Sequence, residues 1–121
     1  MPRSCWSGVI ALLLGLPNLA QASACRPALK IDGIQFSPMQ RPTMERKWTA
    51  VVSVDASRCA AHSGGTFEIG FTRLKETAPD ADFRERFVWT APAVTVAVDF
   101  AADEAVGRYW IENVTPCRCG E

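Results

Sequence analysis

The chain has 121 residues, with thirteen Lys and Arg against thirteen Asp and Glu. This balance provides no basic surface for nucleic acid or for an anionic membrane, so neither is expected as a partner. The length fits a single domain, and a hydrophobic core of this size gains usefully from covalent cross-links.

The first residues predict a secretory signal peptide over residues 1–24. Arg3 precedes an apolar run from about Val9 to Leu16, and small residues follow at Ala22 and Ala24. This order is typical of exported proteins, and the run is well under the roughly 18 residues of a membrane span. We therefore expect export to the periplasm or the extracellular space, with one mature domain over residues 25–121.

Cleavage fits after Ala22 or after Ala24, and the second position would leave Cys25 as the first residue. A bacterial lipoprotein begins in this way. Its processing site usually has Leu three residues before the cysteine, whereas this chain has Ala22. A lipid anchor at Cys25 is therefore disfavoured but remains open.

Removal of the leader also changes the cysteine count. Cys5 leaves with the signal peptide, and Cys25, Cys59, Cys117 and Cys119 remain. An even number of cysteines in a small exported domain predicts two disulfides.

The hydrophobic residues after the leader alternate with a period of two, which is the pattern of β-strands. Six strands are expected, over residues 28–36, 47–57, 66–73, 83–89, 94–100 and 108–114. A slip of phase at Asp32-Gly33 predicts a β-bulge. Residues 37–46 and 75–82 are expected to be loops, and residues 101–107 have room for one helical turn. The sequence thus predicts an antiparallel sandwich or barrel.

The segment "DFAADEAVGRYWIENV" resembles the corner and sixth strand of an immunoglobulin-like or fibronectin-III-like sandwich. The resemblance implies a small all-β sandwich of six or seven strands, with Tyr109 as the corner tyrosine whose hydroxyl bonds to the backbone. Trp48 lies early in the second strand, so an antibody-type domain is not implied, and a seventh strand is missing from the sequence. The resemblance implies nothing definite about function.

Alternating strand directions place all four remaining cysteines at one end of such a sandwich. Residues two apart in a strand have Cα atoms about 6.6 Å apart, whereas disulfides prefer about 5.5–6 Å. A bond between Cys117 and Cys119 is therefore disfavoured. We expect Cys25 and Cys59 each to pair with one of these two, and the sequence leaves open which pairs with which.

Thiol redox chemistry and metal handling are the alternative hypotheses for this cysteine pole. Arg118 would favour a thiolate at Cys117 or Cys119, and Met39, Met44 and His62 would add soft ligands. An oxidising compartment argues against an all-cysteine metal site, and the methionines have no known ligand spacing. We therefore expect no cofactor.

Catalysis by other groups has little support. His62 is the only histidine, and no serine lies in a nucleophile-elbow pattern. The acidic residues are expected to be solvated charges, and calcium at Asp99, Asp103 and Glu104 lacks the oxygen spacing of known loops. Asp80 and Asp82 belong to the same solvated class, and Asn113 begins a sequon followed by Pro116 that makes a poor glycan acceptor.

Binding is the class of function that remains. Trp89 and Trp110 are the candidate anchors for a protein or sugar partner, and Arg84 and Arg86 are candidates for contact with an acidic one. If Tyr109 faces the core, Trp110 faces outward, where it either meets a partner or packs beneath residues 75–82. The sequence thus favours a non-catalytic binding or accessory module whose partner is another protein or an envelope component.

Overall fold

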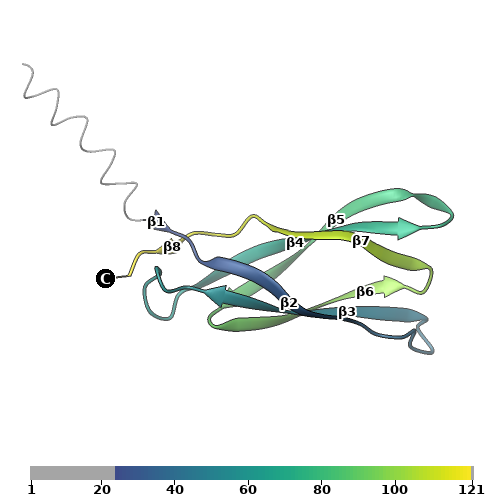
Figure 1. The fold of residues 1–121 in the computed structure, drawn as a ribbon, viewed down its shortest axis with the longest axis horizontal. Coiled ribbons are helices and arrows are strands. Elements are labelled where there is room, and N and C mark those ends of the chain that lie inside the picture. Colours follow the sequence, from purple (N-terminus) through teal and green to yellow (C-terminus); the bar gives the residue numbers. More distant parts are fainter. Residues whose placement is uncertain (1–23, 121) are drawn as a thin grey trace, which may run out of the picture.

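A computed structural model describes residues 24–120, which form antiparallel strands and no helix (Figure 1). The predicted signal peptide lies outside these residues except for Ala24. The strands are β1 (Ala24–Cys25), β2 (Ala28–Phe36), β3 (Glu45–Asp55), β4 (Gly64–Lys75), β5 (Ala78–Thr90), β6 (Ala93–Ala101), β7 (Glu104–Glu112) and β8 (Cys117–Arg118).

The six long strands form two antiparallel sheets that lie face to face (Figure 1). One sheet has the order β2-β3-β6 and the other has the order β5-β4-β7, while the short strands β1 and β8 pair at one end. The expectation of an all-β fold of antiparallel sheets with two disulfides is confirmed.

Alternate residues of the central strands build the core between the sheets. Trp48 and Val52 of β3 face Phe67 and Phe71 of β4, and all four are at most 2% exposed. The ring centroids of Trp48 and Phe71 lie 4.8 Å apart in an edge-to-face arrangement, which aromatic pairs prefer. Each such side chain stabilises the fold by about 1.5–3 kcal/mol when fully buried. The period-two pattern therefore identified the inward faces of β3, β4 and β6.

The predicted bulge is present in β2. The pairing of β2 with β3 shifts register between Asp32 and Gln35, and Gly33 adopts a φ of 57°. This left-handed conformation suits glycine because it lacks a Cβ. The shift returns Phe36 to the core side opposite Trp48, whereas Ile34 is 39% exposed.

One prediction of irregular structure is wrong. Residues 75–82 are not a loop, because β4 and β5 form a long hairpin that turns at Glu76 and Thr77. The first residues of β5 pair through their backbone while their side chains stay exposed, so no hydrophobic alternation marks them. Residues 101–107, which had room for one helical turn, instead contain a tight turn at Ala102 and Asp103.

Candidate functional site

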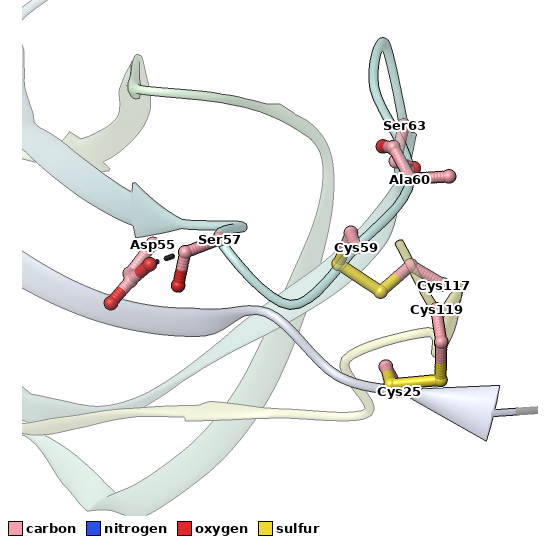
Figure 2. Close-up of a disulfide and its surroundings, with 8 residues drawn as sticks. All are labelled: Cys25, Asp55, Ser57, Cys59, Ala60, Ser63, Cys117 and Cys119. Atoms are coloured by element: carbon pink, nitrogen blue, oxygen red, sulfur yellow. Dashed lines mark hydrogen bonds between the residues drawn. A yellow bond between two sulfur atoms is a disulfide. The ribbon is translucent and has the colours of Figure 1, made fainter. Parts of the chain in front are cut away.

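The four cysteines gather at one end of the molecule, as expected. Cys25 is bonded to Cys119, with Cα atoms 5.0 Å apart, and Cys59 is bonded to Cys117, with Cα atoms 5.6 Å apart. Figure 2 shows the two bonds side by side, each reaching a different part of the chain. Neighbouring Cys117 and Cys119 thus take different partners, and the structure decides the pairing that the sequence left open.

Backbone pairing reinforces both bridges. Cys25 lies opposite Cys117 in the β1–β8 pair, and Cys59 forms an isolated bridge with Cys119. Cys59 and Cys117 are 7% and 8% exposed and belong to the core cluster. The cysteine pole therefore fastens the segment of β8 to β1, just before β2, and to the turn that follows β3.

The residues proposed for metal handling do not come together. Met39 and Met44 lie in the β2–β3 loop and are 40% and 46% exposed, whereas His62 follows the other end of β3. The eleven residues of β3 separate these loops by about 36 Å. Among residues 24–120, no group of three or more His, Cys, Asp or Glu side chains is arranged to hold a metal ion.

The acidic residues named from the sequence lie at the surface, and Asp82 and Asp99 each have a structural partner. Asp99 forms an ion pair with Lys47 at 3.2 Å, and Asp82 accepts a hydrogen bond from the Thr72 hydroxyl at 2.7 Å. Asp80 is exposed.

Glu104 is the exception because its side chain is 8% exposed. Its carboxylate accepts a hydrogen bond from the Ala101 N–H at 2.7 Å and lies 3.0 Å from Nε of Arg73. Nζ of Lys75 lies 3.9 Å from the same carboxylate and 3.8 Å from the carboxylate of Asp103. Glu104 thus closes the β6–β7 turn, and the calcium hypothesis is replaced by a structural role.

Trp89 is not a surface anchor, and its assignment as a binding residue is wrong. Its side chain is 0% exposed and lies opposite Gly65 of β4 on the core side of the sheet. A Cβ at Gly65 would meet Oγ1 of Thr115 and, at 2.8 Å, Nε1 of Trp89, both closer than real Cβ contacts. The indole and the Thr115 hydroxyl therefore share the space that the glycine leaves.

Trp110 faces away from the core, on the outer face of the β5-β4-β7 sheet. Its β4 partner is Gly70, and Arg84 lies beyond Gly70 on β5. A Cβ at Gly70 would fall inside the van der Waals radius of the Trp110 ring. The indole therefore lies flat on the backbone of β4 and is half-buried, rather than beneath residues 75–82.

Hydrogen bonds and charges hold this indole in place. Nε1 of Trp110 donates to Oε2 of Glu112 at 2.8 Å, and Nε of Arg84 donates to the other carboxylate oxygen. The Arg108 guanidinium lies 5.4 Å from the centroid of the indole. Trp110 is therefore a fixed platform between two cations and an acid.

The same contacts shift two pKa values. The hydrogen bond from Trp110, followed by the hydrogen bond and charge of Arg84, lowers the pKa of Glu112. The hydrogen bond to Glu112 and its negative charge raise the pKa of Arg84. Both groups are thus held in their charged forms.

A second row of side chains borders the platform. Arg86 of β5 pairs with Glu68 of β4, and Glu68 pairs on its other side with Glu112 of β7. The Arg86 and Glu68 charges are 4.0 Å apart, and Asn113 donates a hydrogen bond to Glu68. We name these residues the outer-face site: Glu68, Gly70, Arg84, Arg86, Arg108, Trp110 and Glu112.

The sequence identified the outward direction of Trp110, Arg84 and Arg86 from strand phase but missed Glu68, Arg108 and Glu112. Their role depends on the register between β5, β4 and β7, which has no direct signal in one sequence. Gly70 was the available signal, because a glycine inside a strand often marks a close approach.

Comparison of the chain with protein-family models, with curated proteins and with solved structures gave no match in any of the three. Within residues 24–120 there is also no helix long and apolar enough to cross a membrane. Function is therefore argued from the site alone.

Proposed function

We propose that this chain is an exported, non-catalytic binding or accessory module that recognises its partner through the outer-face site. The observation that carries the proposal is the fixed, half-buried Trp110 platform between Arg84 and Arg108. Tryptophan and arginine are the residues most enriched at the energetic centres of protein interfaces. An ordered indole also loses little conformational entropy when a partner covers it.

The chemistry of the site favours a protein segment that combines an apolar or aromatic residue with acidic side chains. The apolar part would cover the exposed face of the indole. Arg86 keeps a side chain that is 73% exposed and a long contact of 4.0 Å to Glu68, so its charge is available to an acid of the partner. Exchange of such weak surface pairs costs little.

The compartment fits this role. Two disulfides are consistent with an oxidising, exported environment, and the leader predicted over residues 1–24 would deliver the chain there. The partner would accordingly be an envelope or extracellular protein.

The strand orders β2-β3-β6 and β5-β4-β7 support an immunoglobulin-like arrangement as part of the proposal. Tyr109 does not supply the expected corner, because its hydroxyl has no hydrogen bond within residues 24–120, and its ring lies 5.9 Å from that of Trp48. The proposed resemblance therefore rests on strand order and not on the corner motif.

The test compares partner capture by the immobilised wild-type protein, Trp110→Ala and Val51→Ala. Val51 is the matched control, because it is an apolar residue on the outside of the other sheet and is 40% exposed. Envelope proteins retained by wild type and Val51→Ala, but lost by a stably folded Trp110→Ala, would support the proposal. Equal retention by Trp110→Ala would contradict it.

A further inference from the structure

The two sheets have four edge strands, and two of these, β5 and β2, carry features that protect against pairing with another strand. On β5, Glu85 pairs with Ile69 and so points toward the core side of the sheet, and an inward-pointing charge is a known device against edge pairing. On β2, the bulge at Gly33 interrupts the regular edge. β6 is joined to β5 of the opposite sheet by the short turn at Ala91 and Pro92.

The edge of β7 has no such protection. Its register with β4 shifts between Thr72 and Arg73 and is regular from Arg108 to Glu112. The core-side residues of this regular part are Tyr109 and Ile111, neither of which is charged. Within residues 24–120, no strand pairs with the other side of β7.

The core-side residues of β7 are also incompletely covered. Tyr109 is 44% exposed although its ring contacts Trp48 of the core. Its β4 partner, Phe71, is 0% exposed. A strand added beside β7 would cover Tyr109 and satisfy the free backbone groups of that edge.

The charges along β7 indicate what that strand is. The outer-face residues of its regular part are Arg108, Trp110 and Glu112, a cation and an anion at equal distances from a central aromatic residue. We infer that β7 pairs antiparallel with β7 of a second copy of this chain, centred on Trp110, to form a six-stranded sheet across a two-fold axis.

Each contact in this register is favourable. Arg108 of each copy lies opposite Glu112 of the other, which gives two cross-strand pairs of opposite charge. On the core side, Tyr109 lies opposite Ile111, and an aromatic residue beside a β-branched one is a stabilising cross-strand pair. The interface is isologous, as two-fold symmetry requires.

This dimer goes beyond the proposed binding function and does not depend on it. The two Trp110 platforms lie side by side, so the outer-face site of one copy continues into that of the other. Loss of the dimer with partner capture retained would overturn only the dimer, and loss of capture with the dimer retained would overturn only the binding function.

The test is sedimentation velocity of the oxidised protein from about 1 μM to 1 mM, the range in which modest interfaces dissociate. Wild type is expected to form a dimer as its concentration rises. Arg108→Glu alone and Glu112→Arg alone each place two like charges opposite each other, and each is expected to weaken the dimer at least about tenfold. An equimolar mixture of these two variants pairs opposite charges again and is expected to form a heterodimer.

Arg86→Glu is the matched control, because it makes the same charge change on the opposite edge of the same sheet. It is expected to leave the dimer unchanged. A wild-type protein that stays monomeric over the whole range, a mixture that does not associate, or an equal effect of Arg86→Glu would each overturn the inference.

Hydrogen exchange of the wild type tests the same pairing without any variant. The amides of residues 108–112 are expected to become more protected as the protein concentration rises, while those of β5 do not. Protection of β7 that is independent of concentration would contradict the dimer.

Discussion

The indole of Trp110 lies directly on Gly70, in the space where any other residue at position 70 would place its Cβ. The close approach links two strands that share the outer-face site, and it explains a glycine in the middle of β4. Glycine inside a strand otherwise weakens it, so the packing of the indole offsets the loss of a side chain.

We therefore expect Gly70→Ala to lower the free energy of unfolding by about 1–3 kcal/mol, the usual cost of inserting a methyl group into a packed contact. Urea denaturation measures this change. The double variant Gly70→Ala with Trp110→Ala removes the ring that the methyl group would meet. In the Trp110→Ala background the Gly70→Ala change should therefore cost little, and an undiminished cost would show that the contact is not the cause.

The two disulfides give a prediction about stability. Replacing Cys59 and Cys117 together by Ser opens a bridge between residues 58 positions apart, which should cost about 2–5 kcal/mol. The double replacement avoids leaving a free thiol in the core. A loss below about 0.5 kcal/mol in urea denaturation would contradict a stabilising role for this bridge.

Thiol counting separates the structural role of the cysteines from the redox alternative. The oxidised mature protein should have no reactive thiol among Cys25, Cys59, Cys117 and Cys119, and its intact mass should show the loss of one hydrogen per cysteine. The Cys25–Cys119 bridge is the more exposed of the two, so partial reduction should open it first. A reduction potential above about −200 mV for either bridge would instead favour redox chemistry.

The lowered pKa of Glu112 predicts acid sensitivity at the outer-face site. A carboxyl whose pKa is lower in the folded state binds fewer protons when folded, so its contribution to stability is present above its unfolded pKa. That contribution is lost as the pH falls below the ordinary glutamate value of about 4.3. Because the pair with Arg84 is exposed, high salt should reduce the effect.

The measurement is the urea midpoint of wild type and Glu112→Gln between neutral pH and pH 3. The difference between the two proteins should shrink on acidification, because the carboxyl of the wild type becomes neutral like the amide. A difference that stays constant over this range would show that the charge of Glu112 does not contribute.

Strand β4 is an example of what the sequence could predict. The alternation of Phe67, Ile69 and Phe71 identified its inward face, because a strand that is buried on one side carries apolar residues at every second position. Gly33 likewise marked the bulge of β2. The cysteine pole followed from strand direction alone, and C-x-C geometry then disfavoured a bond between Cys117 and Cys119.

The remaining features depend on pairings between distant residues. The start of β5 buries no side chains, so nothing in its sequence distinguishes it from a loop. Glu112 reaches Arg84 only because β4 holds β5 and β7 in one register. Trp89 and Trp110 have the same residue type, and the phase of their strands decides that one is core and the other is surface.

Glu104 is the last residue whose role the structure changes, from a calcium candidate to the closure of the β6–β7 turn. Glu104→Ala should lower the free energy of unfolding by about 1–3 kcal/mol, because the Ala101 N–H loses its acceptor in a partly buried position. Arg73 also loses the anion 3.0 Å from its Nε.

Glu104→Gln is the matched control. Its amide oxygen still accepts from the Ala101 N–H, while the charge facing Arg73 and Lys75 is gone. An intermediate loss of stability in urea would assign part of the effect to the hydrogen bond and part to the ion pairs. If calcium stabilised wild type but not Glu104→Gln against urea, the structural role would be incomplete and the cation hypothesis would return.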